Sequence, residues 1–543
     1  MPETEMTVED HQRALAQEQH HRPRLECEQI IQRASSINKD LINRMQNSQI
    51  GRTYICGYDF HTKQLCFVAV LLILFVLSII SVSLIWFTSS FDNFVLSHLI
   101  ITPKNDIFEE WSNPTYRSHV KVHIFNYTNI DAFKAGKDKK LRVKDIGPYH
   151  YEEIKEKINV QVHDNGTVTY QDRLNHRFNP RLSKGKQSDV IYVPNILTLS
   201  AAKKTENNFF MQWTASVTLQ SPFIKQAAHR FIWGYEDNAY NLMKGVLRFQ
   251  NQRVSDNIGL LATRNGTLPY TLTVGTGSKS INNIANAIKI DSNTQFGKWS
   301  TEECDRIHGS DGTQFNPFLI REKKPITVLT PESCRTLEYV FSHEVKVINK
   351  TIKAYKYILP TSVYDAPDKN PDNQCYCDLD SGYCAPQGFL DISKCVFDTP
   401  LYISMPHFYN VDPDYFKVDG LDPTYSKAES YLMVHPRMGF AIGGSYKFQI
   451  NILAKNLFGF TSMSMFKDDT MLPIAWVDVG LEENAIPEKT IEKMYQGTFV
   501  VKNIELGIKY VSILVMILSA AAIVIVTRSK WEGKIKNCYT NSA

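Results

Sequence analysis

The chain has 543 residues, of which 43% are hydrophobic and 21% are charged. Its 60 basic and 56 acidic side chains leave a formal net charge of +4. This is not the strong positive charge that is typical of nucleic-acid-binding proteins, so we do not expect nucleic acid as a partner. This composition suits a folded domain, so the two long apolar runs near the chain ends need a separate explanation.

Residues 1–64 form a polar tail. After Pro23 apolar side chains recur at helical spacing, which predicts an amphipathic helix for a partner or for a membrane surface. Within this helix Glu26, Ile30 and Ile31 resemble an acidic dileucine signal, which cytosolic sorting adaptors would bind. The same isoleucines also serve the helix, so both interpretations stay open.

Two apolar runs are long enough to cross a membrane. They predict one transmembrane helix over 65–87 and a second over 508–527, with a buried core helix as the alternative for each. The first run starts too late and is too long for a cleaved signal peptide. Basic residues precede the first helix and follow the second. Positive flanks favour the cytosol, so 1–64 and 528–543 are expected to be cytosolic. The ectodomain, 88–507, is then extracellular or lumenal.

Candidate modification sites agree with this orientation. All four Asn-x-Thr sequons lie between the two apolar runs, and none lies in either tail. The predicted glycan acceptors are Asn126, Asn165, Asn265 and Asn349. Cysteines near the membrane or in the tails are palmitoylation candidates, with an unmodified thiol as the alternative; these are Cys56, Cys66 and Cys538.

Short strands are predicted in the part of the ectodomain that follows the first apolar run. Residues 119–125, 158–162 and 168–170 alternate between apolar and polar side chains, and the sequence Asp-Asn-Gly at 164–166 predicts a hairpin between the last two. A basic run precedes the hairpin. We expect this run to be a solvated loop, with a patch that binds an anionic ligand as the alternative. Its residues are Lys134, Lys137, Lys139, Lys140, Arg142 and Lys144.

Residues 196–250 are predicted to be mainly helical. Ser221 followed by Pro222 matches a helix start, because serine caps the first turn and proline fits its first position, so a helix is predicted over 223–233. Core packing would explain the aromatic side chains of this segment. The functional alternative is an exposed surface that captures a ligand through Lys203, Lys204, Phe209, Phe210, Trp213, Phe223, Lys225 and Arg230.

From 251 to 500 short strands return, separated by Gly, Pro and Asn turns, as at 270–274, 352–359 and 446–452. Many short strands with one helical insertion predict an α+β fold with an antiparallel, barrel-like sheet. Six cysteines fall within 304–395, which predicts a disulfide framework in an oxidising compartment; they are Cys304, Cys334, Cys375, Cys377, Cys384 and Cys395. Zinc is the alternative, but it would require a different spacing, such as paired C-x-x-C knuckles.

No catalytic or cofactor motif is recognisable. The glycines at 275–280 do not match the spacing of a phosphate-binding loop, and neither G-x-S-x-G nor H-E-x-x-H occurs. His407 is expected to be a packed histidine, and the aspartates around Cys375 and Cys377 do not follow a calcium-loop pattern. We therefore expect no enzyme activity, no cofactor and no bound metal.

Several long motifs occur in a fixed order between the two apolar runs. They include IGPYHY at 146–151, WGYED at 233–237, NPDNQCYC at 370–377, PLYISMPHF at 400–408 and DGLDP at 419–423. On these motifs the chain resembles the class B scavenger receptor or fatty-acid translocase family over roughly 65–530. Within the family it resembles the insect-type members, which include the sensory neuron membrane proteins.

The resemblance implies an antiparallel β-barrel ectodomain with an apical helical bundle at 196–245, a lipid-lined tunnel and two transmembrane anchors. It also implies one disulfide pairing: Cys304–Cys375, Cys334–Cys395 and Cys377–Cys384. The implied function is to bind lipids or lipoprotein particles and to transfer apolar cargo to the membrane. The implied location is the plasma membrane, with the endosomal or lysosomal membrane as the alternative.

Other functions are kept as alternatives. A two-span ligand-gated channel would share this topology, but the second apolar run offers only Ser512 and Ser519 as polar lining. An ectonucleotidase is disfavoured by the missing phosphate-binding loops. A docking or endocytic receptor without a lipid conduit also fits. Val217 stands where some family members carry a lysine that meets anionic lipid, so fatty-acid specificity is not carried over.

Overall fold

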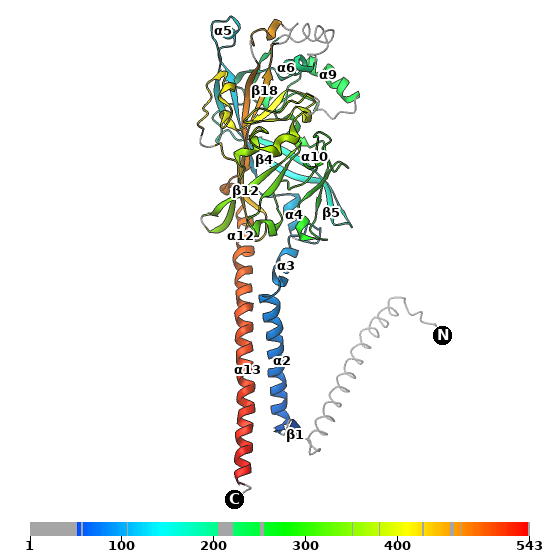
Figure 1. The fold of residues 1–543 in the computed structure, drawn as a ribbon, viewed down its shortest axis with the longest axis vertical. Coiled ribbons are helices and arrows are strands. Elements are labelled where there is room, and N and C mark those ends of the chain that lie inside the picture. Colours follow the sequence, from blue (N-terminus) through cyan, green and yellow to red (C-terminus); the bar gives the residue numbers. More distant parts are fainter. Residues whose placement is uncertain are drawn as a thin grey trace, which may run out of the picture. The chain divides into compact units, whose positions relative to one another are not determined.

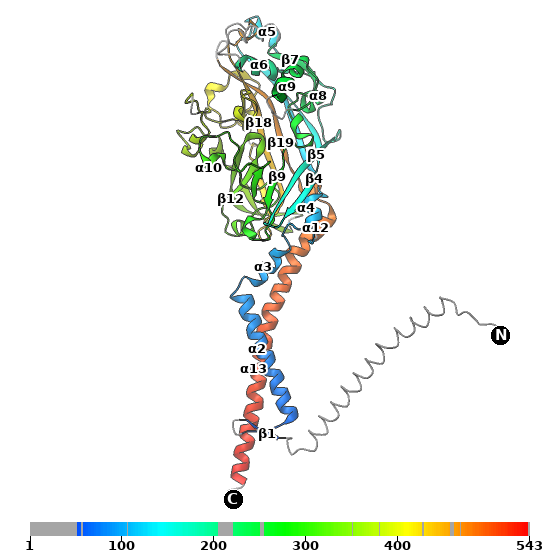
Figure 2. The same cartoon turned by 90° about the vertical axis from the view of Figure 1, so that its right-hand side faces the viewer.

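The computed structural model describes residues 52–55, 58–105, 107–204, 221–249, 255–349, 351–378, 381–425, 428–456, 461–466 and 469–540. The chain divides into two compact units. We call Met1–Phe91 with Lys502–Ala543 the helix unit and Asp92–Val501 the barrel unit. Figures 1 and 2 show the two long helices and the barrel that characterise them.

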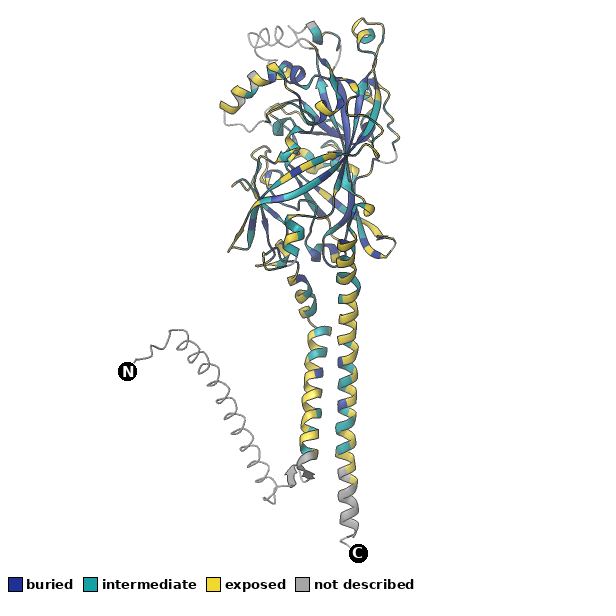
Figure 3. Cartoon of the chain, turned by 180° about the vertical axis from the view of Figure 1, so that it is seen from behind, coloured by how far each residue is buried: buried dark blue, intermediate teal, exposed yellow. Residues whose placement is uncertain are grey.

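The helix unit contains α2 (Thr62–Trp86) and α13 (Val501–Thr540), with a small hairpin of β1 (Arg52–Ile55) and β2 (Tyr58–His61). Two helical segments, Gln64–Trp86 and Glu488–Ser529, are long and apolar enough to cross a membrane. Most of their side chains are exposed (Figure 3), as expected for helices that face lipid. Their few hydroxyls, such as that of Ser512, donate to carbonyls of the preceding turn, so they need no water.

The barrel unit is built on one 15-stranded sheet in the order β10-β9-β5-β4-β3-β19-β18-β17-β13-β12-β11, with β8, β14, β15 and β16 attached to it. Except for the parallel pair of β16 with β4, the strands are antiparallel. Their bounds are β3 Ser118–Tyr127, β4 Leu141–His163, β5 Thr167–Phe178, β8 Gly266–Thr267, β9 Leu272–Gly275, β10 Ala287–Ile290, β11 Ile326–Thr330, β12 Arg335–Val347, β13 Ile352–Ile358, β14 Phe389–Asp391, β15 Leu401–Ser404, β16 Val418–Asp419, β17 Tyr431–Val434, β18 Ala441–Ala454 and β19 Thr470–Leu481.

The predicted hairpin is confirmed. Strands β4 and β5 pair from His163 opposite Thr167, and Gly166 in the turn has φ +85°, a conformation that favours glycine. The central strand β19 is buried along most of its length, because both of its faces are covered. The alternating pattern of the sequence therefore predicted these two strands correctly, whereas the continuous apolar run of β19 reflects its central position.

A short loop nearly closes the sheet into a barrel. The N–H of Ala287 in β10 donates to the carbonyl of Gly309 at 2.7 Å, and Ser310 exchanges two backbone hydrogen bonds with β11 at 2.9 and 2.7 Å. Gly309 has φ +88°, and a Cβ there would lie 2.9 Å from the carbonyl oxygen of Thr327. The glycine thus allows this loop to lie against β11. We call this line of contact the seam.

Several helices lie at the two ends of the barrel unit, whereas α10 lies beside the middle of the sheet (Figures 1 and 2). At one end lie α4 and α12, close in sequence to the points where the chain enters and leaves the unit, and at the opposite end lie α5, α6 and α9. The bounds are α3 Ser90–Ser97, α4 Ile107–Ser112, α5 Ile130–Lys134, α6 Ile196–Lys204, α8 Ala228–Trp233, α9 Asn238–Phe249, α10 Glu302–Asp305, α11 Pro317–Arg321 and α12 Glu488–Tyr495.

Part of the predicted helix over 223–233 is wrong. Residues Phe223–Ala227 form strand β7, which pairs with β6 (Val190–Pro194), and α8 begins only at Ala228. The Ser221 hydroxyl does accept the N–H of Phe223 at 3.2 Å, but the backbone then extends. Pairing with a distant strand outweighs the local helix-start signal.

Three disulfides link the segment 304–395, in the pairing that the family resemblance implies. Cys304 is joined to Cys375, Cys334 to Cys395 and Cys377 to Cys384. Arg335 is buried among them, with its guanidinium 3.7 Å from the ring centroid of Tyr376 and 4.7 Å from that of Trp299. Burial lowers the pKa of Arg335 to about 10.

Candidate functional site: a cavity inside the barrel

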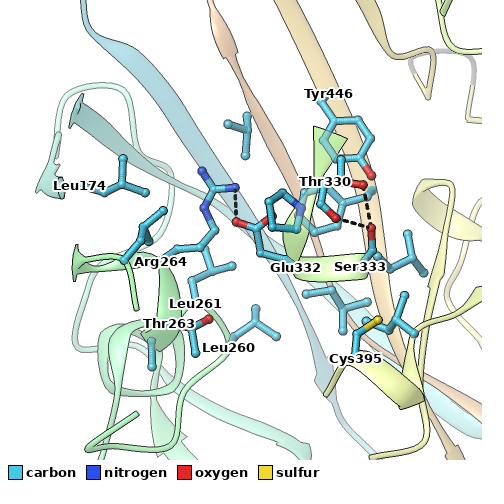
Figure 4. A pocket seen from close by; sticks show the side chains of 18 of the residues that line it. Leu174, Leu260, Leu261, Thr263, Arg264, Thr330, Glu332, Ser333, Cys395 and Tyr446 are labelled. Atoms are coloured by element: carbon cyan, nitrogen blue, oxygen red, sulfur yellow. Dashed lines mark hydrogen bonds and ion pairs between the residues drawn. The ribbon is translucent and has the colours of Figure 1, made fainter. Parts of the chain in front are cut away.

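A cavity of about 710 Å³ occupies the interior of the barrel. Strands from all around the sheet contribute to its wall, among them β4, β5, β11, β18 and β19. Figure 4 shows three loops that approach one another at its side, around Leu260–Arg264, Thr330–Ser333 and Cys395. The disulfide between Cys334 and Cys395 therefore holds one of the segments that line the cavity.

Most of the wall is apolar. Alternate residues of the strands point inward, and many of them are only partly buried although they lie inside the barrel, because they face the cavity. The apolar lining includes Leu174, Leu260, Leu261, Val328, Val396, Ile403, Leu432, Phe448, Ile450, Val479 and Leu481. Such a surface favours the apolar part of a ligand.

One side of the wall carries charges. The ammonium of Lys155 lies 3.2 Å from a carboxylate oxygen of Asp172 and 3.2 Å from one of Asp311. Lys157 reaches the same carboxylates at 3.3 and 3.4 Å. Burial by itself raises the pKa of Asp311, but the two lysine charges hold it well below its usual range. Burial disfavours the charged form of Lys157 and lowers its pKa.

A second group of ionisable side chains borders the first. Arg264 lies 3.4 Å from Glu153 and 3.8 Å from Glu332, as Figure 4 shows for the latter pair. His176 donates to the buried carboxylate of Glu153 at 3.0 Å. Burial alone would raise the pKa of Glu153, but the hydrogen bond from His176 and the charge of Arg264 lower it to about 2. The carboxylate is thus ionised and paired inside the barrel.

The predicted capture residues do not form one group. Lys203 and Lys204 end α6, and Lys204 also lines the cavity. Phe223 is buried and packs against Tyr127 at a ring distance of 4.9 Å, so it belongs to the core. Lys225 and Arg230 are exposed on β7 and α8. The other predicted capture residues, Phe209, Phe210 and Trp213, lie outside the described residues.

The predicted tail sites also lie outside the described residues. These are Glu26, Ile30, Ile31, Cys56 and the side chain of Cys538. The sorting signal and the palmitoylation of Cys56 and Cys538 therefore stay predictions. Cys66 is exposed on α2 and forms no disulfide in the part of the chain that the structure describes.

Three of the four sequons lie at exposed turns or strand ends. Asn165, Asn265 and Asn349 have exposed side chains. Asn126 differs, because it lies within β3, is half-buried and accepts the backbone N–H of Tyr192 at 2.7 Å. A glycan on Asn126 would have to displace that hydrogen bond.

His407 is packed, as expected. Its imidazole is buried, lies 3.2 Å from a carboxylate oxygen of Asp145 and packs nearly perpendicular to the ring of Phe125. Over the residues that the structure describes, no group of three or more His, Cys, Asp or Glu side chains is arranged to hold a metal ion.

Sequence reasoning missed the charged side of the cavity. Glu153, Lys155 and Lys157 are spaced by two residues in β4, which places them on one face of the strand. That spacing was the available signal. It was weak because the opposite face also carries charges, at Glu152 and Glu156, so the inward face could not be distinguished.

Comparison with known proteins agrees with this geometry. The family model of the CD36 family matches residues 69–527. Scavenger receptor class B member 1 of Bos taurus is 28% identical over 408 residues, which is 74% of this chain and 77% of that protein. Lysosome membrane protein 2 of Rattus norvegicus is 25% identical over 424 residues, or 77% of this chain and 86% of that protein.

The match covers most of the chain, including both candidate membrane spans for most of their length. One relative is a scavenger receptor by name and the other a membrane protein, and the nearly closed barrel is consistent with the same fold. This chain is therefore a two-span, class B scavenger receptor-like membrane protein and belongs to the CD36 family.

Proposed function

We propose that the protein captures a lipid or a lipid-bearing particle and passes apolar cargo through the barrel cavity to the membrane, without catalysis or a cofactor. The observation that carries this proposal is the apolar cavity of about 710 Å³ inside the barrel. Its volume lies within the range of roughly 300–1,000 Å³ that small-ligand sites have. A lipid tail that leaves water gains about 0.8 kcal/mol per buried CH₂, so the apolar part of the wall favours its passage.

The topology that goes with this function is also a proposal. The tails 1–64 and 528–543 are cytosolic, and 88–507 faces the outside of the cell or the lumen of an endosome or lysosome. The sequons and the three disulfides, which all lie in the barrel unit, support this orientation. The segment 196–245 acts as the capturing head.

The conduit is tested by narrowing it. Val479→Trp places an aromatic ring at a half-buried position of the cavity wall in β19. Val162→Trp is the matched control, because Val162 is 43% exposed on β4 and does not line the cavity. Uptake of a labelled lipid by cells and binding of its carrier are measured for both variants. Val479→Trp should bind the carrier normally and transfer little lipid.

Equal transfer by Val479→Trp and wild type would rule out the conduit. The protein would then be a docking receptor whose cargo enters by endocytosis. Capture is tested separately with Lys225→Gln and Arg230→Gln, which should weaken binding of an anionic carrier, more strongly at low salt. Lys298→Gln, an exposed lysine elsewhere on the barrel unit, serves as the control.

A further inference from the structure

The cavity does not account for a strongly charged surface of the barrel unit. This surface, which we call the cationic row, runs from α5 into β4 and consists of Lys134, Lys137, Lys139, Lys140, Arg142 and Lys144. Residues 130–144 contain these six cations and two carboxylates, Asp131 and Asp138. This short segment thus has a net charge of +4, as large as that of the whole chain.

The cations of the row are largely unneutralised. All six side chains are exposed. In the described part of the chain, one ion pair involves the row: Lys140 lies 3.8 Å from Asp419, and both side chains are about half exposed. Such a solvated pair contributes little attraction, so the row keeps nearly its full charge.

The backbone that carries the row is held in place. The side-chain amide of Asn129 donates to the carboxylate of Asp138 at 2.7 Å and to the carbonyl of Lys140 at 3.0 Å, and its oxygen accepts the N–H of Arg142 at 2.7 Å. Phe133 of α5 packs against Phe466, with 6.3 Å between the ring centroids. Binding therefore orders only side chains, which reduces its entropic cost.

The row is narrow. Arg142 and Lys144 are exposed between buried Leu141 and Val143, so they share one face of β4 and follow each other at about 7 Å. The neighbouring strands do not widen it, because β3 places Asn126 beside Lys144 and β16 places Asp419 beside Arg142. The cations thus form a line, not a broad patch.

Within its own segment, which the structure describes throughout, the row has no large exposed apolar companions. Within 130–144, Leu141 and Val143 are buried, and Ile130 and Phe133 are half-buried against the core. A membrane-docking surface normally adds exposed apolar or aromatic side chains that enter the bilayer, and a protein interface normally adds aromatic anchors. A line of cations without either is suited to a partner that is itself a chain of charges.

We propose that the cationic row is a binding site for a linear sulfated polysaccharide. Its sulfates would meet the lysine ammonium groups as point charges, in succession along α5 and β4. This interaction is separate from the cavity and does not depend on the proposed lipid transfer. It gives the protein a second, purely electrostatic attachment on the side where α5 lies.

The experiment uses the full-length protein in a neutral detergent, with heparin as the probe. The row variant combines Lys134→Gln, Lys137→Gln, Lys139→Gln and Lys144→Gln. The control variant combines Lys279→Gln, Lys289→Gln, Lys298→Gln and Lys346→Gln, four exposed lysines elsewhere on the barrel unit. Heparin affinity is measured as a function of salt concentration, and equal thermal unfolding midpoints establish that the variants are folded.

The row variant should bind heparin about 100-fold more weakly at low salt. The slope of log Kd against log salt should fall by up to about four, since each lost contact releases about one counterion fewer. The control variant should bind like wild type, and inorganic sulfate at the same charge concentration should compete poorly.

Equal loss in both variants, or none in the row variant, would overturn the proposal. Vesicles of phosphatidylcholine with and without phosphatidylserine provide a further arm. If the row mutations abolish binding to phosphatidylserine vesicles but leave heparin binding intact, the partner of the row is a membrane surface and the polysaccharide proposal is wrong.

Discussion

Removing the charge of Glu153 should destabilise the barrel unit in a pH-dependent way. Glu153 is 5% exposed, and both His176 and Arg264 contact its carboxylate. Its pKa falls from the ordinary value of 4.5 to about 2. A difference of that size corresponds to about 3 kcal/mol of stability at pH 7. Glu153→Gln should lose most of it, because Arg264 keeps its charge but loses its buried partner.

The pH dependence has a definite direction. The folded-state pKa is below the unfolded-state pKa, so the stabilisation is complete above about pH 4.5 and is lost as the pH falls toward 2. The difference between wild type and Glu153→Gln should stay near 3 kcal/mol down to about pH 5 and fall to about 1 kcal/mol at pH 3.

Denaturant unfolding of the full-length protein with intact disulfides measures this difference at several pH values. Glu338→Gln is the matched control, because Glu338 is an exposed glutamate on β12. A difference that stays constant from pH 7 to pH 3 would refute the assignment of a strongly lowered pKa. A Glu153→Gln variant as stable as Glu338→Gln would refute the energetic role of the ion pairs.

Three further predictions concern the disulfide-rich segment and the glycans. Peptide mapping without reduction should recover Cys304 linked to Cys375, Cys334 to Cys395 and Cys377 to Cys384, and a free thiol at Cys304 or Cys395 would contradict this pairing. Mass spectrometry after glycosidase treatment should identify Asn165, Asn265 and Asn349, but not Asn126, as sites that had carried a glycan. An occupied Asn126 would contradict its hydrogen bond to Tyr192. Arg335→Lys should be less stable than Arg335→Met by about 1–2 kcal/mol, because lysine keeps the buried charge without a planar group to stack on Tyr376 and Trp299. Equal unfolding midpoints for the two variants would contradict the expected cost of a buried charge without a stacking partner.

The strands were the part of the fold that local pattern could predict. Residues 119–125 lie in β3, and the hairpin at 164–166 follows from turn chemistry that needs no distant partner. The segment 223–227 shows where such reasoning fails, because its strand exists only through pairing with β6. Local signals for a helix were present, and a contact that the sequence does not display outweighed them.

The cavity could be predicted only from the family resemblance, not from the sequence pattern. Its charged side joins Lys155 of β4 and Asp172 of β5, which are neighbours in the hairpin, to Asp311 beside the seam, and Asp311 meets them only when the sheet curves into a barrel. Periodicity can assign a residue to a face of its own strand, but not to a partner across the barrel. The family resemblance implied the tunnel, but the ion pairs inside it could be identified only from the structure.

The seam has a mechanical consequence. Along β4 and β5 the wall is held by a long ladder of backbone pairs, whereas at the seam the loop around Gly309 and Ser310 makes only a few hydrogen bonds. Opening the wall there disrupts fewer backbone hydrogen bonds than opening it between β4 and β5. Asp311, which follows the seam directly, is paired with Lys155 and Lys157, so these ion pairs connect the seam loop to β4. We expect the interior to expand for a bulky occupant along this line, with the rest of the wall remaining rigid.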